Sequence, residues 1–235
     1  MLTPSPDQAA KGSPSKVAAN LAQVREVLSG SEMPVKLTAV TKNATIEQIQ
    51  EVHALGVHDF GESKIQDALK KRDQLAPQVV QDCAWHFIGH LQSNKVKQAV
   101  GNFALIHSID SLRLAREVSR IAGERGQIQP LLLQVKLQSD DNKSGFTADQ
   151  LRDCMSEIIA LPSIKVEGLM TISPLTEEAQ VWQKSFEGLR NLRDELEKSH
   201  GIELKELSMG MSDDWRDAIT YGSTMIRLGR AIFGN

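Results

Sequence analysis

The sequence predicts an α/β protein built as a single (β/α)₈ barrel, the TIM-barrel architecture, and three observations support that fold class. Eight β-rich segments alternate with helical segments, which is the pattern of a parallel sheet. The 235 residues suit one barrel, which needs roughly 250. Hydrophobic residues make up 40% of the chain and aromatic residues only 4%, so we expect a mostly aliphatic core. An open doubly wound sheet has the same local alternation, but eight regular units favour the closed barrel.

The start of the chain predicts a flexible tail followed by an extra helix. Residues 1–14 are polar and rich in Pro and Ser, whereas 15–235 carry the barrel pattern. Apolar residues then fall on one face at helical spacing before Gly30 ends the helix: Val17, Leu21, Val24 and Leu28. We therefore expect one N-terminal helix outside the eight repeating units.

The eight strands are expected where β-rich or apolar runs end at polar or glycine-containing loops. The clearest is PLLLQVKL (130–137), which is nearly all apolar, as expected for a parallel strand covered on both faces. The eight segments are 35–42, 58–63, 84–90, 104–110, 130–137, 165–172, 205–210 and 225–234. Segment 138–146 is a polar loop, and no linker divides the chain.

The helices between these strands carry recognisable start and stop signals. Thr45 and Gln48 form a candidate capping box for a helix that closes at Gly56, and Thr147 with Gln150 opens another. Further helices are expected before residue 75, after 90, over 114–121, up to Gly201 and over 213–222.

Composition excludes several classes of protein. The formal net charge of −3 gives no broad electrostatic reason to expect nucleic acid or an acidic membrane as a partner. No apolar run reaches about 18 residues and no secretory signal opens the chain, so we expect a cytoplasmic protein. Cys83 and Cys154 lie in no zinc-ligand spacing, so we expect no metal site and two reduced, buried thiols.

Lys42 is the strongest candidate functional residue, because it ends the first predicted strand. Functional groups of a (β/α)₈ barrel lie where strands end and loops begin. In VKLTAVTK, alternation puts Val40 and Lys42 on one side, so Lys42 would reach the barrel mouth if Val40 faces inward. A partly desolvated amine there has a lowered pKa and forms imines with aldehydes. The alternative, equally open from the pattern, is that Lys42 extends to water or pairs with a carboxylate.

The last two strand ends form a candidate anion site. SMGMSDDW (208–215) and IRLGRAIFG (226–234) place Ser208, Arg227 and Gly229 where this architecture commonly binds phosphate. Ordinary turn chemistry explains the glycines equally well.

Two histidines four residues apart, His86 and His90, also follow a strand. Their spacing matches metal ligands only on a helix, and this segment is predicted to be a strand and a loop. A hydrogen-bonded core position for His86 and a loop position for His90 are at least as consistent with the pattern as a catalytic role.

Six motifs together resemble those of a known family, the pyridoxal 5′-phosphate (PLP) homeostasis proteins, with the likeness closest to the cyanobacterial member. The motifs are LTAVTK, HDFGES, WHFIGHLQSNK, GLMTI, LSMGMSDDW and IRLGRAIFG, and the match runs from about residue 17 to 235. The resemblance implies the barrel of the alanine racemase N-terminal domain with an extra N-terminal helix. Two places differ from the common pattern of the family. Ser63 stands where many members have Asn, and the residues after Lys42 are NAT where many members have a Lys-Pro pair.

The resemblance also implies a cofactor and its ligands. Lys42 takes the place of the lysine that forms the internal aldimine with PLP. Ser208 matches a phosphate-binding serine, and Arg227 with Gly229 matches residues near the ring nitrogen and the phosphate. Met170, Ser63 and His86 are further expected pocket residues.

The function that follows is PLP binding in vitamin B6 homeostasis, with little or no racemase activity. Racemases of this fold use a tyrosine from a second subunit, supported by a β domain that we do not expect after Asn235. The single tyrosine, Tyr221, lies in a predicted helix. We expect a monomer that supplies PLP to apoenzymes. The alternative is a PLP-dependent enzyme acting on an unidentified amino acid.

Overall fold

Eight strands alternate with helices along the chain. The computed structural model describes residues 14–137, 144–174, 176 and 178–234, and the strands lie within them. They are β1 (Lys36–Val40), β2 (Asp59–Glu62), β3 (Ala84–Phe87), β4 (Leu105–Ile109), β5 (Gln129–Gln134), β6 (Ile164–Met170), β7 (Glu206–Ser208) and β8 (Met225–Leu228).

Each strand pairs in parallel with the next along the chain, and β8 pairs with β1. The sheet is therefore a closed barrel, which confirms the predicted architecture and excludes the open doubly wound sheet. The register at the closure aligns Leu37 with Ile226 and Ala39 with Leu228. Because all strands run in the same direction, their carboxyl ends converge at one mouth of the barrel.

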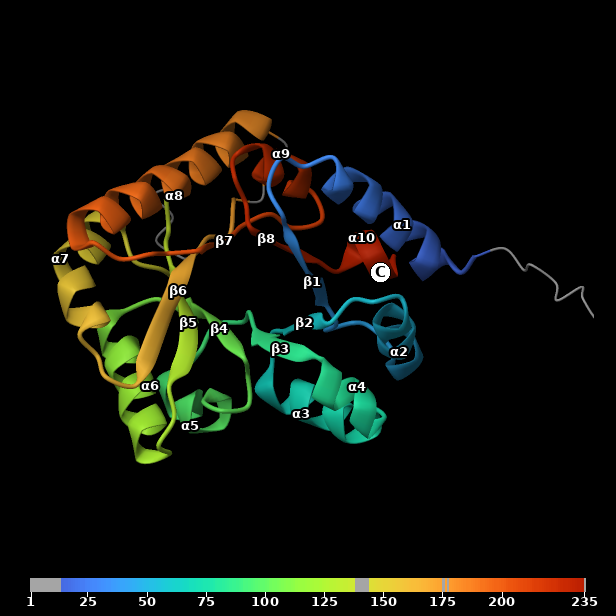
Figure 1. Ribbon diagram of the computed structural model, residues 1–235, viewed down its shortest axis with the longest axis horizontal. Helices are drawn as coiled ribbons and strands as arrows, with labels where there is room; N and C mark the ends of the chain where they lie inside the picture. The colour runs from blue at the N-terminus through green and yellow to red at the C-terminus, as the bar shows by residue number, and fades with distance from the viewer. Residues whose placement is uncertain (1–13, 138–143, 175, 177, 235) are drawn as a thin grey trace, which may run out of the picture.

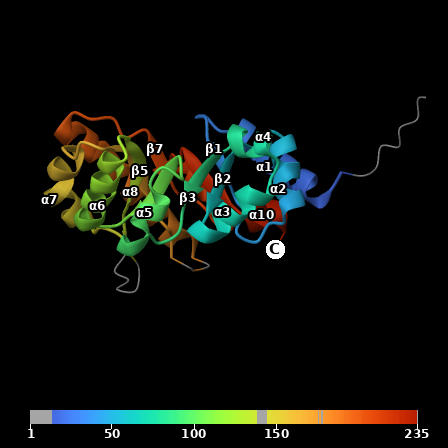
Figure 2. The same cartoon turned by 90° about the horizontal axis from the view of Figure 1, so that it is seen from below.

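Helices surround this barrel (Figure 1). In the described residues they are α1 (Lys16–Ser29), α2 (Ile46–Ala54), α3 (Ile65–Gln74), α4 (Pro77–Asp82), the 3₁₀ helix η1 (Ser93–Lys95), α5 (Val96–Ala99), α6 (Leu112–Glu124), α7 (Ala148–Ile159), α8 (Ala179–His200), α9 (Trp215–Thr220) and α10 (Arg230–Phe233). The predicted extra N-terminal helix is α1, which packs against α10 and α2. Figure 2 shows α1, α2, α4 and α10 together at the end where the C-terminus is marked.

Local signals in the sequence account for where the helices begin and end. The predicted capping boxes of α2 and α7 both form, at Thr45 with Gln48 and at Thr147 with Gln150. Gly201 ends α8 in the left-handed conformation at φ 63°, which a glycine adopts without steric cost. These helix ends confirm the expectations drawn from the chain.

Two predicted elements differ from the observed ones. Segment 225–234 is not one strand, because β8 stops at Leu228 and the short helix α10 follows Gly229. The six-residue helix α4 was not predicted, since it is too short to show helical periodicity, although Pro77 at its start is a helix-opening residue.

Buried apolar side chains of the described residues form two separate clusters. The large core lies between the sheet and the helices and includes the stripe on α8 formed by Phe186, Leu189 and Leu196. A small cluster is separate from this core, and its four members all come from strands: Leu105, Leu132, Met170 and Met225. Aliphatic residues predominate in both regions, as the composition predicted.

Other expectations have mixed outcomes. Cys83 and Cys154 are both free, but they are half-buried rather than buried. In the described part of the chain no helix is both long enough and apolar enough to cross a membrane. The predicted tail lies outside the described residues except for Pro14, as does most of the polar loop 138–146, so the division of the chain at residue 14 stays a prediction.

Gly168→Ala should destabilise the barrel where β6 meets β7. A β-carbon at this position would lie 1.9 Å from the Glu206 carbonyl oxygen, so the paired backbones would have to separate. We expect a loss of about 3 kcal/mol in the free energy of unfolding, measured by urea denaturation. As a control, Gly188→Ala in α8, with its nearest atom 3.5 Å away, should stabilise by roughly 0.5 kcal/mol. Equal stability of the two variants would contradict this account.

Candidate functional site

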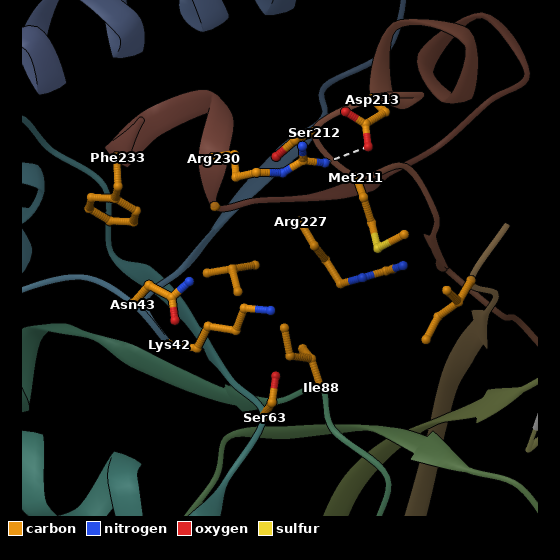
Figure 3. Close-up of a pocket in the computed structure, with 13 residues that line it drawn as sticks. Lys42, Asn43, Ser63, Ile88, Met211, Ser212, Asp213, Arg227, Arg230 and Phe233 are labelled. Carbon is orange, nitrogen blue, oxygen red and sulfur yellow. Dashed lines mark hydrogen bonds and ion pairs between the residues drawn. The ribbon is translucent and has the colours of Figure 1, made fainter. Parts of the chain in front are cut away.

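A pocket of about 360 Å³ opens where several strands end. Its wall combines residues that follow β1, β2, β3, β6, β7 and β8, so it lies at the carboxyl-terminal mouth of the barrel. Among the described residues the wall consists of Val40, Lys42, Asn43, Ser63, Ile88, Ile172, Met211, Ser212, Asp213, Arg227, Gly229, Arg230 and Phe233 (Figure 3).

Lys42 lies two residues beyond β1, and its side chain extends into this pocket. In Figure 3 its amine lies between Ser63 and the Arg227 side chain. Val40 lines the same pocket, as the predicted alternation requires. The expected partial desolvation of Lys42 is not found, because the residue is exposed. The amine is therefore open to a ligand arriving from solution.

The backbone before Lys42 is fixed by a buried ion pair behind the strand. The Thr41 amide donates to the Gly61 carbonyl at 3.0 Å, and the Thr41 hydroxyl donates to Glu62 Oε1 at 2.6 Å. Lys71 Nζ donates to the same carboxylate oxygen at 2.7 Å and also to the Thr41 carbonyl. The Glu62 side chain is only 1% exposed, so these hydrogen bonds are shielded from water. They fix the backbone that carries Lys42.

Arg227 reaches the pocket from inside the barrel. It is buried, with Nη1 donating to Ser208 Oγ at 2.5 Å and Nη2 donating to the Thr171 carbonyl at 2.9 Å. Burial lowers the pKa of its guanidinium to about 10, although the nearby Asp214 carboxylate opposes that shift. Arg227 therefore stays protonated at neutral pH.

The β7 and β8 ends contribute a second group of polar residues. The Arg230 guanidinium donates to Asp213 Oδ2 at 2.5 Å, and Ser212 Oγ accepts from the Ala231 amide at 3.3 Å. Gly229 lies between Arg227 of β8 and Arg230 of α10 in the chain and lines the same wall. Sequence reasoning had not singled out Ser212, Asp213 or Arg230, although they lie within or next to the motifs SMGMSDDW and IRLGRAIFG.

The pocket carries a positive balance of charge. Lys42, Arg227 and Arg230 line it, against the single carboxylate of Asp213 among the described lining residues. An amine that can attack a carbonyl thus lies beside groups that bind anions. The wall is suited to a small molecule that carries both a reactive carbonyl and a negative charge.

The residues expected at the site from the sequence divide into two groups. Lys42, Ser63, Arg227 and Gly229 line the pocket. Three others do not: Ser208, Met170 and His86 are buried inside the barrel, at 0%, 0% and 3% exposure. Their expected direct contact with a ligand therefore lacks geometric support, although Ile172, in the loop after Met170, does line the pocket.

A chain of hydrogen bonds connects the pocket to the barrel interior. Asp59 Oδ1 lies 3.1 Å from His86 Nε2, and His86 Nδ1 lies 2.9 Å from His107 Nε2. His107 Nδ1 then lies 3.0 Å from Ser208 Oγ, which accepts from Arg227. The chain therefore runs from an acid at the start of β2 to the cation in the pocket.

One arrangement of protons satisfies each member of this chain when both imidazole rings are neutral. Arg227 donates to Ser208 Oγ, and the Ser208 hydroxyl donates to His107 Nδ1, its other partner in the described residues. His107 then donates from Nε2 to His86 Nδ1, and His86 donates from Nε2 to Asp59. Burial, with the neighbouring His86 and Arg227, lowers the pKa of His107 well below its usual range, so this ring is neutral.

A family model and several known proteins match nearly the whole chain. The family model described as alanine racemase, N-terminal domain, matches residues 13–235. The pyridoxal phosphate homeostasis protein of Synechocystis is 44% identical over 210 residues, covering 89% of this chain and 95% of the relative. Those of Aquifex aeolicus and Escherichia coli are 37% and 36% identical, covering 94% and 93% of this chain and 95% and 96% of the relatives.

Solved structures agree with these relatives. PipY of Synechococcus elongatus, with PLP bound, is 40% identical with a TM-score of 0.84, covering 93% of this chain and 100% of that one. The alanine racemase of Clostridium difficile has a TM-score of 0.77 at 16% identity, covering 94% of this chain and 56% of that one. The racemase likeness therefore concerns the fold alone.

The buried His107 predicts a specific acid sensitivity. Its pKa is lowered in the folded state, so below about pH 6.5 the unfolded chain binds a proton that the folded chain refuses, and stability falls by up to about 1.4 kcal/mol per pH unit. His107→Gln should be less stable at neutral pH but should lose less stability on acidification, measured by urea unfolding from pH 7.5 to 5. An unchanged slope in His107→Gln would refute the assignment.

Proposed function

The chain belongs to the pyridoxal phosphate homeostasis protein family, and from this premise we propose that it binds PLP as a Schiff base on Lys42. In this proposal the protein takes part in intracellular PLP (vitamin B6) homeostasis in the cytoplasm and supplies the cofactor to apoenzymes. The observation that carries the proposal is the amine of Lys42 projecting into a pocket whose wall is otherwise rich in cationic side chains.

Pyridoxal phosphate supplies an aldehyde, a phosphate and a ring nitrogen, and this wall offers a partner for each. Lys42 Nζ meets the aldehyde, and water leaves when the imine bond forms. Arg230, Ser212 and Gly229 line the same pocket, and we assign the Arg230 guanidinium, the Ser212 hydroxyl and the backbone at Gly229 to the phosphate. Ser212 takes the role that the sequence suggested for Ser208, because Ser208 lies inside the barrel with no exposed surface.

Arg227 would serve the ring nitrogen in this arrangement. Its guanidinium donates hydrogen bonds to Ser208 Oγ and to the Thr171 carbonyl on the side of the barrel interior. At neutral pH the guanidinium can only donate hydrogen bonds. A donor that keeps its own proton leaves the ring nitrogen unprotonated, which weakens the ring as an electron sink. This supports binding and release of the cofactor over amino-acid chemistry.

The pocket wall also favours a carrier over a racemase. Its described lining contains no histidine, tyrosine or glutamate, and its carboxylate, Asp213, is paired with Arg230. Tyr221 caps α9 and packs against the large core rather than lining the pocket. Lys42 is therefore the one group in the described lining suited to move a proton. Its exposure lets an incoming amine displace it from the cofactor.

We propose a monomeric state on the distribution of exposed apolar residues. Large exposed hydrophobic side chains in the described residues are scattered over separate segments rather than gathered in a patch: Met33, Ile128, Ile159 and Ile172. Sedimentation of the purified protein at micromolar concentration tests this, and a stable dimer would contradict it.

Lys42→Ala should abolish covalent binding of PLP. The parent protein, incubated with PLP, should show the visible absorbance of a Schiff base, and borohydride reduction followed by peptide mapping should place the modification on Lys42. In the variant the band should vanish, and affinity should fall roughly a hundredfold, equivalent to about 2.7 kcal/mol. Lys64→Ala, which removes an exposed lysine outside the pocket, should behave as the parent. A Lys42→Ala protein that keeps the band would refute the proposal.

Exchange of the α-proton of an amino acid with solvent distinguishes a carrier from a racemase-like enzyme. The PLP-loaded protein, mixed with a panel of amino acids in deuterated water, should show no α-proton exchange above the rate of free PLP by NMR. The same loaded protein should transfer PLP to a PLP-dependent apoenzyme and restore its activity. Rapid α-proton exchange that disappears in Lys42→Ala would support the enzyme instead.

A further inference from the structure

Three residues of the kind that bind transition metals meet at the amino-terminal end of the barrel. They are His53 near the end of α2, His58 just before β2 and Cys83 just before β3. The pocket around Lys42 lies at the carboxyl ends of the strands, so this cluster is at the opposite end of the barrel. The spacing of these residues along the chain matches no metal-binding motif, because only the fold brings them together.

The backbone holds the three residues in place. Gly56, at φ 83°, reverses the chain after α2 and returns His58 to His53, whose rings lie edge to face with centroids 5.2 Å apart. The β2–β3 register aligns Asp59 with Ala84, which places His58 beside Cys83. The Ala84 amide donates to the His58 carbonyl at 2.8 Å and fixes that alignment.

The ligand atoms are close to the spacing that a metal ion needs. A ring nitrogen of each histidine and the Cys83 sulfur all lie within 4.8 Å of one another. Around a tetrahedral Zn²⁺, with bonds of about 2.0 Å to nitrogen and about 2.3 Å to sulfur, ligand atoms lie about 3.5 Å apart. Because His58 is exposed, small rotations of its side chain can close the remaining gap.

The surroundings of the cluster favour a cation. Asp82 Oδ2 lies 3.5 Å from His53 Nε2, a buried nitrogen that makes no hydrogen bond within the described residues. The carboxylate of Asp82 directly precedes Cys83 in the chain, and that of Asp59 directly follows His58. These two carboxylates place negative charge beside the cluster, and a divalent cation would be attracted to it.

We propose that His53, His58 and Cys83, with a carboxylate oxygen of Asp82, bind one Zn²⁺ ion. Two imidazoles and a thiolate suit a borderline-soft ion such as Zn²⁺ rather than Mg²⁺ or Ca²⁺, which prefer oxygen ligands alone. On binding, the Cys83 thiol releases its proton to solvent and both histidines coordinate as neutral rings. The ion would join the end of α2 to the start of β3 and thereby stabilise this end of the barrel. α2 and α4 are neighbours in both Figure 1 and Figure 2.

Cobalt substitution tests the ligand set directly. Full-length protein, freed of metal by a chelator and titrated with Co²⁺, should develop a thiolate-to-cobalt charge-transfer band that saturates at one equivalent. Cys83→Ser should abolish the band, whereas Cys154→Ser, which removes the other half-buried thiol, should leave it unchanged. A parent protein without the band, or a band that persists in Cys83→Ser, would overturn the proposal.

Zinc affinity and thermal stability provide a second readout. One Zn²⁺ per chain should raise the melting temperature of the parent and of Lys42→Ala, which separates this site from the PLP pocket. His58→Ala alters an exposed side chain and should fold normally, but it should weaken zinc binding at least about tenfold. Weak binding of several ions per chain, with no change on mutation of His58 or Cys83, would identify adventitious binding and refute the site.

Discussion

The pairing of β8 with β1 is the constraint on which the site depends. The register that aligns Thr38 with Arg227 brings the first and last strands of the chain side by side. Lys42, beyond the end of β1, and Gly229 with Arg230, beyond the end of β8, therefore share one pocket wall. In an open sheet with these strands at its two edges, the amine and the anion-binding groups would be far apart, and neither group alone would hold a phosphorylated aldehyde.

Hydrogen bonds inside the barrel fix the position of the Arg227 guanidinium. Barrels of this class usually fill this space with branched apolar side chains, but here a hydrogen-bonded chain from Asp59 to Arg227 occupies part of it. A buried polar network is costly when it is only partly satisfied, and in this one each member has a hydrogen-bond partner. The guanidinium of Arg227 is consequently held from within the core. The pocket inherits its geometry from the folded barrel rather than from a flexible loop.

The two ends of the barrel differ in their chemistry. The carboxyl-terminal end gathers cations around an exposed amine, which suits reversible capture of an anionic aldehyde. The amino-terminal end gathers His53, His58 and Cys83 near carboxylates, which suits a metal ion. In the proposed role as a carrier, the protein needs an accessible amine that another amine can displace, and the exposure of Lys42 is consistent with that role. A stabilising ion at the far end would not interfere with that exchange.

The sequence by itself determined the alternation of strands and helices, the capping boxes of α2 and α7, and the family, because these depend on residues near one another in the chain. It also identified Lys42, Ser63, Arg227 and Gly229, since strand ends converge in a parallel barrel. Only the tertiary structure decided that Ser208, Met170 and His86 lie inside the barrel, that Ser212 and Arg230 reach the pocket, and that His107 joins the polar chain. It alone brought Cys83 to two histidines. These outcomes depend on register and on which face of a strand points inward, and both are fixed by contacts between segments far apart in the chain.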